Sequence, residues 1–328
     1  MNTQTRIQIE AFFALLALLG SMLLFAGGPA DAASGRGRWR ADYFPNVPLV
    51  TPDGETVYFY DDLIKDKVVA INFIFTSCEN SCPAETARLR QVQKILGERV
   101  GRDIFMYSIS IDPENDTPEV LGDYAKKFDV GPGWLFLTGQ EEDITLLRKK
   151  LGLFIEEIQD GSKDHNVSLI VGNEATGRWM RRSPFDNPKA LATNLGDWLH
   201  NWKVAKQKRN DYSKVKTQPK YSRGEYLFRS RCSACHTLGD GDTLGPDLIG
   251  VTAKRDRAWL SRWIAVPDQM LAEKDPIAME LFKRYRELPM PNLQLNDIDV
   301  AAVIDYMEKE NERRAPAPAT EHAHHQHH

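Results

Sequence analysis

Two cysteines, Cys78 and Cys82, follow a short apolar run, VVAINFIF, at residues 68–75. A short run of β-branched and aromatic residues is typical of a buried strand. Pro83 suits the first turn of a helix, and residues 85–89 are good helix formers. The pair therefore lies where a strand passes into a helix N-terminus, and we expect the chain to be organised around this junction. The helix dipole there favours thiolate, the form of cysteine that attacks disulfides and binds metals.

Three interpretations of this cysteine pair remain open. The first is a structural disulfide, for which a strand–helix junction is a poor place. The second is a redox dithiol of the thioredoxin type, although the spacing is C-x-x-x-C rather than C-x-x-C. The third is a site for a soft metal ion that a ligand elsewhere in the chain completes.

Length and charge narrow the class of protein. With 328 residues, the chain is long enough for two domains. A hydrophobic content of 42% and a formal net charge of −4 are those of an ordinary globular protein. Nothing in the chain is basic enough for a nucleic-acid interface, so we exclude nucleic acid as a partner.

The N-terminal segment, residues 1–32, is not expected to be part of the fold. Residues 11–26 are almost entirely apolar and follow Arg6, and residues 30–32 fit an A-x-A cleavage site. We interpret the segment as a secretory signal cut after Ala32. The alternative is an uncleaved membrane anchor, because Glu10 weakens the basic region of a signal. Either interpretation places the rest of the chain in the periplasm, free or anchored to the inner membrane.

Residues 33–205 are predicted to form one α/β domain. Thr117 and Pro118 are expected to cap and begin a helix within it, as part of a structural turn. The other expected elements are helix 83–98, strand 104–111, strand 134–137, helix 141–151, a hairpin of 167–171 with 178–180, and helix 188–206. On the last helix, the side chains that recur at helical spacing are expected in the core: Leu191, Leu195, Trp198 and Trp202.

His165 immediately precedes the predicted hairpin. A histidine in a loop is usually just a solvated side chain. This one, however, stands at the start of a strand that should neighbour the cysteine strand in a thioredoxin-like sheet. Thioredoxin-like oxidoreductases commonly place a proline at that position, where this chain has His165 and Asn166.

Three sequence motifs now combine. Residues 75–83 read FTSCENSCP, residues 110–118 read SIDPENDTP, and residues 164–165 read DH. In this order the set resembles the Sco (SenC/PrrC) family over about residues 42–203. The resemblance implies a thioredoxin-like fold that binds copper through two cysteines and one histidine, matched here by Cys78, Cys82 and His165. It also implies a role in assembling the dinuclear copper centre of a haem–copper oxidase, whose copper-binding subunit is then the partner.

A second motif, CSACH at residues 232–236, follows a polar linker at residues 206–220. C-x-x-C-H is a haem attachment sequence, although zinc sites also use C-x-x-C. A helix before the motif, the GPDL stretch after it, and a terminal helix at residues 297–309 give it context. This order resembles a class I cytochrome c over about residues 221–310, and we expect the domain to occupy 221–312.

The cytochrome resemblance implies a role for each residue of a haem c site. Cys232 and Cys235 carry the thioether bonds, His236 is the proximal axial ligand, and Pro246 offers its carbonyl to that histidine. Haem iron with His and Met ligands is typical of such cytochromes. We choose Met290, in a loop between prolines, over three other methionines. Met279 and Met307 stand on helical patterns and are expected in the core; the third is Met270.

The tail at residues 313–328 carries five of the eight histidines of the chain. Clustered neutral imidazoles bind Cu(II), Ni(II) or Zn(II). A native metal-capturing tail and a cloning remnant are both consistent with the pattern, which Ala323 and Gln326 interrupt. The histidines concerned are His322, His324, His325, His327 and His328.

The expected function is that of a copper metallochaperone for oxidase assembly, with a fused c-type haem domain for one-electron redox control of the copper. The alternative is an enzyme, a thiol–disulfide reductase that keeps the cysteines of the oxidase subunit reduced. A third function is plain electron transfer, in which the first domain only docks partners. A redox donor is a further candidate partner. The two motifs use all four cysteines of the chain, so none remains for a structural disulfide.

Overall fold

The structure is a computed structural model, and it describes residues 42–78, 81–154, 167–201 and 220–314. The first three ranges build an α/β part of the chain, and the fourth builds a helical part.

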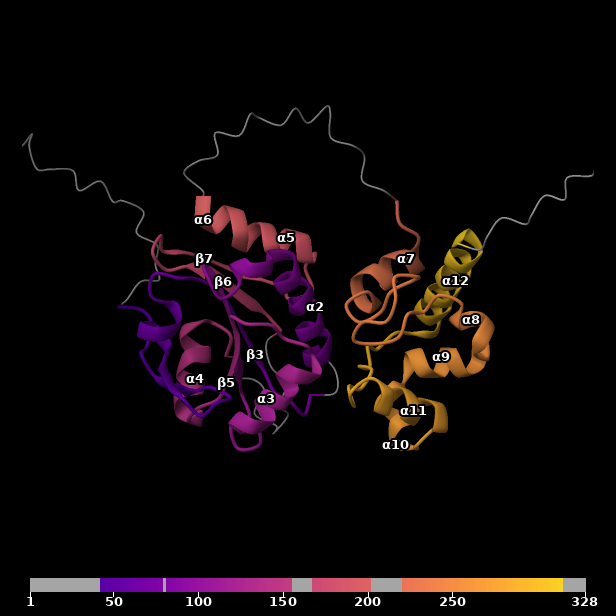
Figure 1. Cartoon of the computed structure of the whole chain (residues 1–328), viewed down its shortest axis with the longest axis horizontal. Helices are drawn as coiled ribbons and strands as arrows, with labels where there is room; N and C mark the ends of the chain where they lie inside the picture. Colours follow the sequence, from indigo (N-terminus) through magenta and orange to yellow (C-terminus); the bar gives the residue numbers. More distant parts are fainter. Residues whose placement is uncertain (1–41, 79–80, 155–166, 202–219, 315–328) are drawn as a thin grey trace, which may run out of the picture. The chain divides into compact units, whose positions relative to one another are not determined.

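In the described α/β part, five strands form one mixed sheet in the order β5-β4-β3-β6-β7 (Figure 1). β3 is parallel to β4 and β4 to β5, whereas β6 is antiparallel to both of its neighbours. A separate hairpin pairs β1, Pro48–Val50, with β2, Thr56–Tyr58. The strands of the sheet are β3 Val68–Ile74, β4 Ile104–Ser110, β5 Trp134–Leu137, β6 Leu169–Asn173 and β7 Arg178–Arg182.

The central strand, β3, is buried on both faces, as its continuous apolar run predicts. Because successive side chains point to opposite faces of a strand, its residues divide between two apolar clusters. Val68, Ala70 and Ile74 pack in one cluster, and the alternate residues Val69, Ile71 and Phe73 pack in the other. The first cluster includes residues of α2 Ser81–Leu96, α3 Pro118–Lys127 and α5 Pro188–Thr193. The second includes residues of α4 Glu141–Lys150 and the short helical segment η1 Phe59–Ile64.

Local sequence accounts for where α3 begins. The side chain of Thr117 accepts a hydrogen bond from the backbone N–H of Val120, and Pro118 is the first residue of α3. This confirms the predicted cap, which satisfies one of the N–H groups that a helix start leaves unpaired. A short turn, η2 Gly97–Arg99, follows α2. The predicted strand 134–137 and the start of the predicted helix at 141 are also found in the structure.

The last helix of the α/β part corrects one core prediction. α5 begins at Pro188 as expected, but the chain continues through a π-helical segment, η3 Asn194–Trp198, and then α6 Leu199–Asn201. Leu191 and Leu195 are fully buried, whereas the side chain of Trp198 is 62% exposed, so its placement in the core was wrong. A π-helical turn is wider than an α-helical turn, so the 3.6-residue period fails there and Leu199 is buried instead. Trp202 lies outside the described residues.

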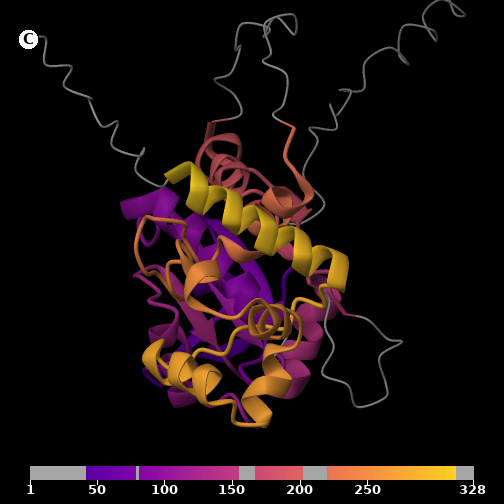
Figure 2. The ribbon, with the colours of Figure 1, turned by 90° about the vertical axis from the view of Figure 1, so that its right-hand side faces the viewer.

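The helical part begins with α7 Arg223–Leu227 and η5 Phe228–Cys232 and ends with α12 Asp297–Arg314, the yellow helix in Figure 2. α12 is longer than predicted, and an ion pair of Arg313 with Glu310 at 2.6 Å supports its last turn. The helices between them are α8 Val251–Lys254, α9 Arg257–Ala265, α10 Pro267–Ala272 and α11 Pro276–Arg284.

The first and last helices of this part pack closely. A Cβ atom on Gly224 of α7 would lie 1.8 Å from the backbone oxygen of Ala302 on α12, so only glycine permits the contact. Phe228, Val303 and Ile304 belong to the apolar core beneath it. The order of helices therefore closes the part around one core.

No helix among the described residues is long and apolar enough to cross a membrane. The predicted signal or anchor at 1–32 lies outside those residues, as does most of the predicted linker and tail. The functions assigned to these segments remain predictions.

Candidate metal and haem sites

The cysteine pair stands at the carboxyl end of β3. The chain leaves the strand after Ile74 and turns, with the backbone N–H of Cys78 donating to the carbonyl of Phe75 at 3.3 Å. Cys82 is the second residue of α2, and its backbone N–H donates to the Sγ of Cys78 at 3.5 Å. Both thiols are buried, with exposed fractions of 8% and 0%. The strand and the helix thus hold the two cysteines together inside the fold.

The ionisation of Cys82 differs from the prediction. Its side-chain hydrogen bond with Cys78 raises the pKa of the Cys82 thiol, and burial raises that pKa further. A helix N-terminus lowers the pKa of a thiol only while the charged form stays solvated or paired with a cation. For Cys82, the expectation that the helix dipole favours thiolate was therefore wrong, because the hydrogen bond with Cys78 and the burial of the thiol both favour its neutral form.

A buried acid, Glu85, lies on the same helix and was not anticipated from the sequence. It is 1% exposed, and burial raises the pKa of its carboxyl group to about 8. Its Oε2 accepts from the Nδ2 of Asn72 on β3 at 3.5 Å, while its Oε1 has no hydrogen-bond partner among the described residues. The Oδ1 of Asn72 in turn accepts from the hydroxyl of Ser108 at 2.7 Å, and that hydroxyl accepts from the indole N–H of Trp134 at 3.0 Å. A polar chain thus crosses the apolar interior from α2 to β5.

The predicted third ligand, His165, lies outside the described residues. The strand after it, β6, neighbours β3, as predicted, and the pairing is antiparallel, with Ile170 opposite Ile71. The chain therefore enters β6 at the edge of the sheet where β3 ends and the cysteine turn begins. In the described part of the chain, no three His, Cys, Asp or Glu side chains gather closely enough to hold a metal ion. The five tail histidines also lie outside it.

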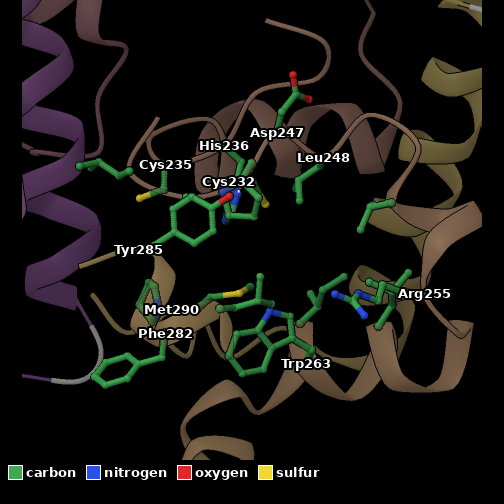
Figure 3. Close-up of a pocket in the computed structure, with 18 of the residues that line it drawn as sticks. Cys232, Cys235, His236, Asp247, Leu248, Arg255, Trp263, Phe282, Tyr285 and Met290 are labelled. Atoms are coloured by element: carbon green, nitrogen blue, oxygen red, sulfur yellow. Dashed lines mark hydrogen bonds between the residues drawn. The ribbon is translucent and has the colours of Figure 1, made fainter. Parts of the chain in front are cut away.

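The helical part contains a cavity of about 510 Å³. Cys232, Cys235, His236 and Met290 all line it (Figure 3). The backbone N–H groups of Cys235 and His236 both donate to the carbonyl of Cys232, at 3.1 and 3.0 Å. This tight turn sets both cysteines and the histidine on one wall of the cavity.

The imidazole of His236 is fixed in place by Pro246 and Gly245. Its Nδ1 hydrogen-bonds with the carbonyl oxygen of Pro246 at 2.9 Å, and burial lowers the pKa of the imidazole. A neutral ring that donates from Nδ1 keeps the lone pair of Nε2 for a metal. A Cβ on Gly245 would lie 2.6 Å from Cε1 of the ring, so glycine is needed for this packing. The wall therefore fixes the orientation and the tautomer that an iron ligand requires.

Met290 lines the cavity from a loop, and Figure 3 shows its sulfur on the side facing His236. Met270 is buried on α10, and it does not line the cavity. Met307 lines the cavity as well, but it is a core residue of α12, as predicted. Met279 lies on α11 but is only half-buried, so it is not the core residue we expected.

The residues of the cavity fit a c-type haem. Its volume lies within the roughly 300–1,000 Å³ usual for ligand and cofactor sites. Apolar side chains such as Leu248 and the stacked pair Trp259 and Trp263, whose ring centres are 5.7 Å apart, line it. Two cysteines, a neutral imidazole and a thioether then provide the donor set that a haem c requires.

Comparisons with known proteins match each of the two parts of the chain to a family. The SCO1/SenC family model matches residues 41–199, and the cytochrome c model matches residues 221–310. A SCO2-like protein of Rickettsia felis is 31% identical over 149 residues, which are 44% of this chain and 70% of that protein.

Solved structures resemble the two parts separately. The structure of Bradyrhizobium japonicum ScoI with copper bound is 23% identical and covers 46% of this chain and 96% of that one, with a TM-score of 0.39. The cytochrome c domain of the pp3183 protein from Pseudomonas putida is 55% identical and covers 27% of this chain and 89% of that domain, with a TM-score of 0.26. The chain thus belongs to the SCO1/SenC family, with a thioredoxin-like α/β fold followed by a cytochrome c domain.

Proposed function

We propose that the protein is a copper metallochaperone that serves the assembly of the dinuclear copper centre of a haem–copper oxidase. Cys78, Cys82 and His165 bind the copper that it delivers to the copper-binding subunit of the oxidase. Two sulfurs and one imidazole form a soft ligand set that suits Cu(I), whereas zinc prefers a fourth protein ligand.

The observation that carries this proposal is the placement of the two thiols. The N–H of Cys82 reaches the Sγ of Cys78 at 3.5 Å, at the edge of the sheet where the chain enters β6 just after His165. A third ligand supplied from that entry completes the set without rearrangement of the sheet. Copper binding displaces the thiol protons, so the raised pKa of Cys82 makes loading depend on pH.

One observation favours the alternative, a thiol–disulfide reductase. The two buried thiols are hydrogen-bonded to each other, and the backbone N–H of Cys82 lies 3.5 Å from the Sγ of Cys78, which suits closure to a disulfide. In that function Cys78 and Cys82 are oxidised together as the disulfide of the oxidase subunit is reduced.

The cytochrome c domain belongs to the proposal through five residues. Cys232 and Cys235 would attach a haem, His236 and Met290 would bind its iron, and Pro246 would orient the imidazole through its carbonyl oxygen. When bound, the haem supplies one-electron chemistry, which matches the Cu(II)/Cu(I) couple better than the two-electron dithiol couple. The domain then provides redox control of the copper, with a separate redox donor as its partner.

The remaining parts of the chain have proposed roles as well. The domain bounds are residues 33–205 and 221–312, joined by the linker 206–220. Residues 1–32 export the protein to the periplasm, where c-type haem is attached, or anchor it to the inner membrane. The tail histidines at 322–328 add a second capture site for metal.

The test uses the full chain with the five tail histidines replaced by alanine, so that only the cysteine site binds copper. Under reducing conditions this protein is expected to bind about one Cu(I) per chain, and Cys78→Ser, Cys82→Ser and His165→Ala each to weaken binding. His200→Ala is the matched control, since this half-buried histidine of α6 lies 3.7 Å from Asp103 instead. Copper binding that survives both serine substitutions contradicts the proposal. The reductase function is supported if the protein without its tail histidines reduces a peptide disulfide, if both serine variants lose this activity, and if His165→Ala keeps it.

A further inference from the structure

A buried carboxylate, Asp116, lies beside the cysteine turn in the segment between β4 and α3. Its side chain is fully buried, and hydrogen-bond donors surround it. The backbone N–H of Thr76 donates to Oδ1 at 3.3 Å and to Oδ2 at 3.1 Å, and the hydroxyl of Thr76 donates to Oδ1 at 2.5 Å. The hydroxyl of Ser110, the last residue of β4, donates to Oδ2 at 2.5 Å. Asp116 thus joins the ends of two neighbouring strands.

The hydrogen bonds to Thr76 replace bonds that the sheet no longer provides. The last backbone hydrogen bond that β3 makes along β4 joins the carbonyl of Ile74 to the N–H of Ile111 at 2.8 Å. Beyond Ile74 the chain turns away, so the N–H of the half-buried Thr76 needs an acceptor outside the sheet. The carboxylate of Asp116 accepts from both donors of Thr76, two residues before Cys78.

This arrangement links the carboxylate to the position of a thiol. The turn from Phe75 to Cys78 is short. The N–H of Cys78 donates a hydrogen bond to the carbonyl of Phe75, and the Sγ of Cys78 accepts one from the N–H of Cys82. Because Thr76 lies inside this turn, a shift of Thr76 moves the Cα of Cys78 relative to α2. The side chain of Asp116 accepts from three donors at once, the N–H and the hydroxyl of Thr76 and the hydroxyl of Ser110, which suits such a clamp.

We propose that Asp116 is a positioning residue of the cysteine site, which sets through Thr76 where the Sγ of Cys78 stands relative to Cys82. The inference rests on the copper-binding function proposed above. It extends that function to a residue 40 positions along the chain from Thr76 that contacts neither thiol ligand in any hydrogen bond described.

The neighbouring residue, Thr117, provides a matched control. It caps α3 through its hydroxyl, which accepts from the N–H of Val120 at 3.4 Å. Loss of a helix cap lowers the stability of a protein without reaching the cysteine turn. Thr117→Ala and Asp116→Asn therefore change adjacent positions with different expected effects on the thiols.

The experiment compares Asp116→Asn, Thr76→Val and Thr117→Ala in the full chain with the tail histidines replaced. Two quantities are measured: the Kd for Cu(I), by competition with a chromophoric chelator, and the dithiol–disulfide equilibrium of the metal-free protein in glutathione buffers. In the second, Cys78 and Cys82 lose two protons and two electrons to one oxidised glutathione, which leaves as two reduced molecules. Circular dichroism reports folding in each variant.

Asp116→Asn presents an amide NH₂ to donors that need an acceptor. We therefore expect Cu(I) binding to weaken by roughly 10–100-fold, as it does when a residue that orients a metal ligand is replaced. The dithiol equilibrium should shift as well. Thr76→Val removes only the hydroxyl and should produce a smaller change of the same sign. Thr117→Ala should lower the unfolding midpoint and leave both quantities unchanged.

Two results overturn the inference: unchanged Cu(I) affinity and dithiol equilibrium in Asp116→Asn, or equal changes in Thr117→Ala. If Asp116→Asn does not fold, Thr76→Val decides by the same criteria. Should the parent protein bind no Cu(I), the proposed function fails, while the metal-free dithiol equilibrium still tests the positioning role.

Discussion

Replacement of Glu85 by glutamine is expected to remove a pH dependence of folding stability. The buried carboxyl keeps its proton in the folded protein up to about pH 8, because burial disfavours its charged form. The nearby Cys78 raises this pKa as well, whereas hydrogen bonds from Asn72 and Ser81 lower it. In the unfolded chain the same group ionises near its ordinary value of 4.5.

The sign follows from proton counts. Between these two values the folded state holds one more proton than the unfolded state, so stability falls as pH rises. The contribution of Glu85 is fully present below the unfolded pKa and is lost as pH rises through the folded pKa. A pKa difference of this size gives a loss of about 4 kcal/mol between about pH 5 and about pH 8.5. Glutamine has nearly the same volume and carries no titrating proton, so its variant lacks this loss.

The assay is chemical unfolding of the reduced, copper-free chain at several pH values, followed by circular dichroism, with haem absorbance reporting the cytochrome domain separately. The free energy of unfolding of the wild-type α/β domain should fall more steeply with pH than that of Glu85→Gln. Glu98→Gln makes the same change at an exposed position of η2 and should parallel the wild type. Parallel curves for the wild type and Glu85→Gln would refute the reasoning, because Glu85 would then be ionised in the folded protein.

Three further predictions concern the cytochrome domain. Met290→Ala should lower the haem reduction potential and leave the haem covalently attached, as redox titration and denaturing electrophoresis would show, because a thioether ligand favours ferrous iron; an unchanged potential contradicts the choice of methionine. Gly245→Ala places a Cβ 2.6 Å from the ring of His236. With haem bound, the iron would keep the ring from moving aside, so denaturant unfolding of the haem-loaded domain should show a loss of about 1–3 kcal/mol of stability. Gly224→Val meets the backbone oxygen of Ala302, which cannot move aside as a side chain can, so thermal unfolding should show a loss of at least about 2 kcal/mol, and an unchanged melting temperature would mean that the helices do not cross there.

Local patterns in the sequence determined much of the fold. The buried run of β3, the strand at 134–137 and the cap at Thr117 were predicted because each depends on neighbouring residues. The place of the cysteine pair at the end of a strand followed from the same reasoning. The sequence motifs also identified the family and the cytochrome domain, since both are defined by residue types at fixed spacing.

Tertiary structure decided what surrounds those residues. Glu85 and Asp116 carry no local signal of burial, and their hydrogen-bond partners Asn72 and Thr76 lie 13 and 40 positions away. The pKa of Cys82 also departs from the prediction, because the thiol is hydrogen-bonded with Cys78 and is desolvated by every element packed around it, neither of which the helix dipole reflects. The prediction that Trp198 lies in the core was wrong because a π-helical turn interrupts the period of its helix. Burial and charge stabilisation are sums over contacts between distant segments, so they become definite only when the chain has folded.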